Sequence, residues 1–251
     1  MYEIKNFIGS LSAITKSRKE KIIVLDVEGY STVRPYNVGY IIADLHGNIY
    51  RKRSFALPPC IWENLTTMLR VGHASEMTMK NVQEILKDCE KPKLKRKYRP
   101  VTPETFTRIF TNDVRIFKVK RMFAYNVNFD KGAIQRLIGV EKFASLGLKC
   151  CDIISGITTT TLMSKDYLNF CKTNNYFTDK GNYLTKAETV IRYLLDDLTY
   201  EEQHTGLEDV LDEYFILLTA LSKHKKIDWK PCQAWRLLKN YAIEKGIDTP
   251  P

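Results

Sequence analysis

Two acidic residues, Asp26 and Glu28, stand one residue apart at the end of the apolar run 22–25. An unbroken run of this kind, rich in β-branched residues, predicts a strand buried on both faces. Because alternate residues of a strand point to the same side, both carboxylates should project together. Neighbouring carboxylates repel each other, and a divalent cation that prefers oxygen ligands relieves the repulsion. The pair favours a metal site, but a solvated strand end would show the same residues, so further acids must decide.

Two later segments offer side chains that suit the same centre. Asp130 follows a predicted strand over 120–125, where a helix begins, and His204 and Asp209 flank the start of a helix predicted over 205–222. Five helical residues span about 500° of rotation, so His204 must lie on the preceding loop if both residues face one site. The neighbouring acids of this helix are interpreted as surface residues: Glu208, Asp212 and Glu213.

With these residues in place, the chain resembles the DEDDh exonucleases over roughly residues 21–222. The resemblance rests on three motifs: Asp26-X-Glu28, then Asn126-X-X-Phe129-Asp130, then His204-X4-Asp209. The stretch around His204 is similar to exonucleases encoded by bacteriophages and prophages. Tyr125 departs from the usual pattern, since histidine is common before the asparagine.

The resemblance implies a 3′–5′ exonuclease that uses two divalent metal ions, Mg²⁺ or Mn²⁺, and releases 5′-mononucleotides. It assigns Asp26 to both ions, Glu28 and Asp209 to the ion that carries the attacking water, and Asp130 to the second ion. His204 would take the proton from that water, and histidine exchanges a proton readily near neutral pH. The expected substrate is a nucleic acid with a free 3′ end, DNA favoured over RNA.

The family also implies residues that contact the substrate. They are Val27, Gly29, Tyr30, Asn126 and Phe129. Tyr30 suits stacking on a base as well as it suits an ordinary loop, and Phe129 suits the core as well as it suits the terminal nucleotide.

The composition is consistent with this reading but does not decide it. The 251 residues are 44% hydrophobic, enough for a substantial core, and the net charge of +10 makes an acidic partner plausible. The six cysteines include no C-x-x-C pair, and no apolar run approaches the roughly 18 residues of a membrane span. We expect a soluble, reduced, cytoplasmic protein without membrane contact, from a bacterium or a phage-infected cell by resemblance.

The elements that must position these residues predict an α/β fold. Strands are expected over 21–26, 36–44 and 49–57 as an antiparallel meander, then over 120–125 and 148–154 as parallel strands after helices. Such a mixed five-stranded sheet flanked by helices agrees with the ribonuclease H-like fold that the resemblance implies. The expected organisation is a basic segment over 1–20, an exonuclease domain over 21–222 with an insertion at about 58–118, and a helical tail over 223–251 that packs on the same domain.

Helix signals accompany these strands. Further helices are expected over 76–88, from Thr102 as N-cap to 114, up to about 138, in two pieces within 165–203, and over 229–247. The second of the two pieces should begin at Thr185, with Glu188 completing a capping box.

Three alternatives stay open at this point. The basic stretch 91–100 is either a solvated linker or a patch that touches phosphates. The tail with Trp229 and Trp235 is either a docking helix or core. Two other functions fit the same motifs: a nucleic-acid-binding module without activity, and a proofreading subunit that needs a polymerase partner. The chain alone leaves both open, together with a homodimer.

Overall fold

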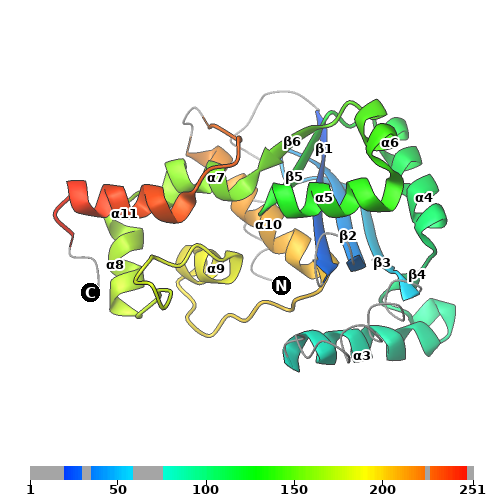
Figure 1. The fold of residues 1–251 in the computed structure, drawn as a ribbon, viewed down its shortest axis with the longest axis horizontal. Coiled ribbons are helices and arrows are strands. Elements are labelled where there is room, and N and C mark those ends of the chain that lie inside the picture. Colours follow the sequence, from blue (N-terminus) through cyan, green and yellow to red (C-terminus); the bar gives the residue numbers. More distant parts are fainter. Residues whose placement is uncertain (1–19, 30–34, 59–75, 224–226, 248–251) are drawn as a thin grey trace.

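A computed structural model describes residues 20–29, 35–58, 76–223 and 227–247, and these form an α/β fold with a six-stranded mixed sheet between helices (Figure 1). The strands are β1 (Lys21–Gly29), β2 (Pro35–Asp44), β3 (Ile49–Ala56), β4 (Arg99–Pro100), β5 (Arg121–Ala124) and β6 (Lys149–Asp152), in the sheet order β4-β3-β2-β1-β5-β6. The helices are α3 (Glu76–Glu90), the 3-10 turn η1 (Lys93–Lys95), α4 (Pro103–Ile116), α5 (Val127–Ile138), α6 (Val140–Ser145), α7 (Ile153–Ile157), the π-helical turn η2 (Thr158–Leu162), α8 (Lys165–Thr173), α9 (Ala187–Leu195), α10 (Gly206–Ser222) and α11 (Ala234–Glu244).

The predicted meander and the parallel crossovers are confirmed. β1 pairs antiparallel with β2, β2 pairs antiparallel with β3, and β1, β5 and β6 run parallel to one another. The expectation of five strands is wrong, because β4 adds a sixth strand parallel to β3. This strand has only two residues and ends the basic stretch 91–100, so it carries no hydrophobic period that a sequence pattern could reveal.

The sheet separates two apolar layers, and β1 contributes to both. Ile22 and Val24 pack in the layer that contains α10, whereas Ile23, Leu25 and Val27 pack in the layer that contains α4 and α5. Side chains alternate along a strand, so the next residues in the first row, at positions 26 and 28, point to the α10 side. The packing of β1 therefore decides which helix meets the two carboxylates.

Helix α10 begins where its backbone touches the sheet. An ideal Cβ built on Gly39 would lie 2.0 Å from the carbonyl carbon of Gly206, so the backbones of β2 and α10 approach so closely here that only glycine fits at position 39. The Asn37 side chain accepts from the Gly206 amide at 2.8 Å and donates to the Phe55 carbonyl at 2.6 Å. Gly39 is also the cross-strand partner of Asp26. The first turn of α10 is thereby fixed beside the acidic end of β1.

On the opposite face, a buried acid joins α4 to the sheet. Asp113 is 3% exposed, and its carboxylate accepts from the Tyr40 hydroxyl at 2.9 Å and from Arg53 Nε at 3.0 Å. A buried carboxylate is tolerated when it is paired and hydrogen-bonded in this way. α4 itself begins as predicted, with Thr102 as N-cap and Pro103 at the first helical position.

Two helix predictions need correction. α9 begins at Ala187 with Lys186 as N-cap, so Thr185 is not the cap. The Thr185 carbonyl instead accepts a hydrogen bond from the Tyr125 hydroxyl at 2.7 Å. Glu188 forms an ion pair with Arg192, one turn later in the same helix. The tail helix is limited to α11, because Pro231 and the residues around it stay non-helical.

The tail residues pack against the α10 layer. Leu238 and Ala242 of α11 are buried there, and Trp229 meets the ring of Phe123 edge-on, whereas Trp235 is 45% exposed. None of the helices in the described part of the chain is both long and apolar enough to cross a membrane.

Candidate functional site

Asp26 and Glu28 lie on the α10 side of the end of β1. The Asp26 Oδ2 atom is buried and has no hydrogen-bond partner among the described residues. Burial raises the pKa of Asp26 well above its usual value, and the charges of Glu213 and Glu28 raise it further. The Glu28 carboxylate accepts from the Tyr36 hydroxyl at 3.4 Å. Among the described residues, the end of β1 thus carries two carboxyl groups with no cationic side chain among the groups that shift the pKa of Asp26.

Asp130 reaches the same place from α5. This helix starts directly after β5, where Asp152 at the end of β6 accepts from the Val127 amide at 3.1 Å. Asp130 is 4% exposed, and its Oδ1 atom accepts from the Val27 amide at 3.0 Å. Burial raises the pKa of Asp130 to about 8, although the hydrogen bond from Val27 opposes the shift. The bond fixes Asp130 next to the peptide that joins the two β1 carboxylates.

Asp209 approaches from the first turn of α10. It is 4% exposed, and its Oδ1 atom has no hydrogen-bond partner among the described residues. Burial raises the pKa of Asp209 to about 10, with further contributions from the charges of Glu202 and Glu28. A hydrogen bond joins the Asp209 and Glu28 carboxyl groups. Two carboxyl groups can form a hydrogen bond only when they share a proton. A bound cation would take the place of that proton.

His204 lies on the loop before α10, as its spacing to Asp209 required. Its backbone adopts a left-handed conformation, with φ of 52°, and its carbonyl accepts from the Asn81 side chain of α3 at 3.1 Å. Ligand atoms of Glu28, His204 and Asp209 all lie within 4.8 Å of one another. His204 is therefore adjacent to the carboxylates, and 33% of its side chain remains exposed.

The remaining predicted residues lie around this cluster in different environments. Asn126 is exposed and precedes α5, while Phe129 is half-buried against the α4–α5 layer. The Val27 side chain is buried in that layer, and its backbone amide donates a hydrogen bond to Asp130. Val27 therefore holds the Asp130 carboxylate in position. Gly29 ends β1, and Tyr30 lies outside the described residues.

The sequence analysis did not assign two acids, Glu213 and Glu202, to this cluster. Asp212 and Glu213 were interpreted as surface residues, which is wrong, because they are 7% and 4% exposed. Asp212 accepts from the Tyr200 hydroxyl, whereas Glu213 lies among the acids described above. Glu202 is the second missed acid; burial and the charge of Asp212 raise its pKa to about 7, and it lies 3.8 Å from His204 Nδ1. The spacing of four from Asp209 to Glu213, which places both on one helix face, was the available signal.

The arrangement fits a divalent cation better than it fits a closed polar network. Buried oxygens of Asp26, Asp209 and Glu213 have no hydrogen-bond partners in the described part of the chain. Buried polar atoms are normally satisfied, and orphaned ones need an explanation such as an ion. The donors are carboxylate oxygens from the end of β1 and from the helices α5 and α10, which suits hard cations such as Mg²⁺ or Mn²⁺.

A cavity lies beside His204, at the edge of the cluster. A space of about 790 Å³ lies between α3 and the loop before α10. Its lining residues are Met79, Lys80, Asn81, Gln83, Glu84, Glu201, Glu202, Gln203 and His204. A ligand in this space would touch the exposed face of His204.

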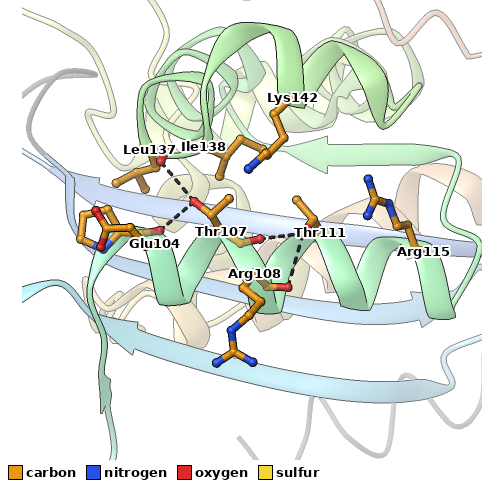
Figure 2. A pocket seen from close by; sticks show the side chains of 9 residues that line it. Glu104, Thr107, Arg108, Thr111, Arg115, Leu137, Ile138 and Lys142 are labelled. Carbon is orange, nitrogen blue, oxygen red and sulfur yellow. Dashed lines mark hydrogen bonds between the residues drawn. The ribbon is translucent and has the colours of Figure 1, made fainter.

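A second concavity, of about 380 Å³, lies on the other face of the sheet, between α4 and the segment α5–α6 (Figure 2). The hydroxyls of Thr107 and Thr111 are bonded there to backbone carbonyls, and Glu104 is the acid of the lining. Because its hydroxyls are occupied and its acid has no second carboxylate beside it in that lining, this pocket offers no comparable chemistry.

Comparisons with known proteins give no further guide to the site. No family model matches the chain, and no curated protein or solved structure matches it either. The site must therefore be judged on its own geometry.

Proposed function

We propose that this protein is a metal-dependent 3′–5′ exonuclease of the DEDDh type with a ribonuclease H-like fold. The observation that carries the proposal is the convergence of Asp26, Glu28, Asp130, Asp209 and His204 from three separate segments of the chain. Structural acids are usually paired with cations or hydrogen-bonded, whereas buried oxygens of this cluster have no partner among the residues that the structure describes.

Each residue has a role that its environment supports. Asp26, Glu28, Asp130 and Asp209 would hold two divalent ions, which supply an activated water and neutralise charge on the scissile phosphate. His204 lies at the accessible edge of the cluster, where it would accept the proton of the attacking water. The Asn81 hydrogen bond to its carbonyl keeps the histidine loop against α3.

The surface beside the site supports a polyanionic substrate. The basic stretch is a folded part of the structure, since it contains η1 and β4, and its Lys91, Lys93, Lys95 and Lys97 are exposed. Lys97 pairs at 2.7 Å with Glu208, the residue before Asp209 in α10. Lys97, beside the first turn of α10, would contact a phosphate of a nucleic acid, DNA in our proposal, as its 3′ end enters.

The test uses single-stranded DNA and RNA labelled at the 3′ or the 5′ end, with Mg²⁺, Mn²⁺ or EDTA. Stepwise loss from the 3′ end, blocked by EDTA, is expected. Asp26→Ala should abolish it, and His204→Ala should slow it by about 10²–10⁴-fold, the usual contribution of a general base. His46→Ala is the matched control, because His46 lies in the turn after β2, at the opposite end of the sheet from Asp26.

The alternatives give different results in the same assay. Binding of nucleic acid without cleavage under any metal would overturn the proposal and favour a binding module. Cleavage that appears only with an added polymerase would favour a proofreading subunit. Equal loss of activity in the His46 and His204 variants would remove the assigned role of His204.

A further inference from the structure

Glu213 is a buried acid whose position none of the three motifs explains. It lies four residues after Asp209, so the two acids share a face of α10. The residue is 4% exposed, and its Oε2 atom has no hydrogen-bond partner among the described residues. The other side of the carboxyl group receives a hydrogen bond from the backbone of Tyr125, directly after β5. Glu213 thus bridges from α10 to the carboxyl end of a central parallel strand.

The neighbours of this carboxyl group are the proposed ion-binding acids. Besides burial, the groups that raise the pKa of Glu213 are Asp130, Asp209 and Glu202. In turn, the charge of Glu213 raises the pKa of Asp26 more than the charges of Glu28, Asp130 and Asp209 do. Asp26 and Glu213 each have one buried oxygen without a hydrogen-bond partner in the described part of the chain. Two such carboxyl groups, from β1 and from α10, therefore lie near each other.

A purely structural role explains this arrangement poorly. A structural carboxylate normally faces a cation or several donors, as Asp113 faces Arg53 and Tyr40. Asp212, the preceding residue of α10, accepts from the Tyr200 hydroxyl. Glu213 has the Tyr125 amide on one side and acids on the other.

We propose that Glu213 is a fifth carboxylate of the cation centre, on the side of Asp26 and Asp130. The ligand class is a hard divalent cation, since the groups around Asp26 and Glu213 among the described residues are carboxylates. The inference rests on the proposed function in one respect, because both need a cation at this cluster. It goes further in assigning an ion-binding role to a residue outside the motifs.

The experiment measures Mn²⁺ binding to the metal-free full chain by calorimetry and by the electron paramagnetic resonance of free Mn²⁺. Glu213→Gln keeps the shape and the acceptor for the Tyr125 amide but removes the charge. Its affinity for at least one Mn²⁺ ion should fall by about 10–100-fold, the usual effect of losing a supporting group at a metal site. Asp212→Asn is the matched control, because it removes one acid from the adjacent, equally buried position; its affinity should stay near that of the unaltered chain.

Thermal unfolding adds a readout that does not depend on catalysis. Without metal, Glu213→Gln should be at least as stable as the unaltered chain, because a buried repulsive group has gone, while the stabilisation by Mn²⁺ should shrink. If this variant does not fold, Glu213→Asp replaces it; it keeps the charge, withdraws the carboxylate by one methylene, and should also weaken binding.

The outcomes separate the two proposals. Unchanged Mn²⁺ affinity in the folded Glu213 variant overturns this inference and leaves the proposed function intact. An equal loss of affinity in the Asp212 control also overturns it, since the effect would then be general to buried acids of α10. If the unaltered chain binds no Mn²⁺, the proposed function fails together with the inference.

Discussion

The metal-free protein should lose stability as the pH rises from about 5 to about 7, because its acid cluster retains protons that the unfolded chain releases. Asp130 gives the size of the effect, since it is 4% exposed and burial raises its pKa from 3.8 to about 8. An acid whose pKa is higher in the folded than in the unfolded state makes its largest contribution to the free energy of unfolding when it is protonated in both states. The contribution is complete below the unfolded value of 3.8 and is lost as the pH rises toward about 8.

One extra proton held by the folded state changes the free energy of unfolding by about 1.4 kcal/mol per pH unit. Over about two pH units the loss is about 3 kcal/mol, which lowers the melting temperature of a chain of this size by about 5–11 °C. Burial raises the pKa values of Asp26, Asp209 and Glu213 in the same direction, so one proton is the smallest expected difference.

The assay is thermal unfolding followed by circular dichroism in EDTA at a series of pH values. With saturating Mn²⁺ the difference from the EDTA samples should widen as the pH rises, because the ligands must be deprotonated to bind. Asp130→Asn should flatten the slope in EDTA, whereas Asp228→Asn, at an exposed position, should leave it unchanged. A melting temperature in EDTA that stays level or rises over this range would refute the reasoning.

Three further predictions concern the supports of the site. Gly39→Ala should lower the free energy of unfolding by about 3 kcal/mol in urea titrations, because the new methyl group would lie 2.0 Å from the Gly206 backbone; an unchanged midpoint would contradict the close approach. Asp113→Ala should cost about 2–3 kcal/mol in the same titration, because a buried hydroxyl and a guanidinium lose their acceptor. Asn81→Ala should lower kcat about tenfold with little change in KM or Mn²⁺ affinity, because only the loop of His204 loosens; loss of Mn²⁺ binding would show that Asn81 acts elsewhere.

Much of the fold was predictable because its signals are local. The apolar run before Asp26 specified β1, the turn after Asp44 specified a hairpin, and Thr102 followed by proline specified the start of α4. Each pattern involves neighbours in the chain, so a single sequence contains it. The convergence of the motif acids was predictable for the same reason, since each one ends a strand or begins a helix.

The errors share a physical cause, which is that they depend on contacts between distant segments. Glu213 is buried because α10 packs on the sheet, with its first residue against Gly39; the spacing of four to Asp209 shows that the two acids share a face but not that this face is buried. Thr185 fails as a helix cap because its carbonyl is held by Tyr125, which is remote in sequence. The two residues of β4 form a strand only because β3 is already present beside them.

The hydrogen bond between Asn37 and the Gly206 amide spans 169 residues and has a consequence for the order of folding. During synthesis the meander emerges from the ribosome long before α10, so Asp26 and Glu28 exist for a time without Asp209 beside them. Contacts of such long range are also the slowest to form, because a long loop must close first. The site is therefore among the last parts of the molecule to be completed, and a nascent chain that lacks α10 carries an incomplete set of acids.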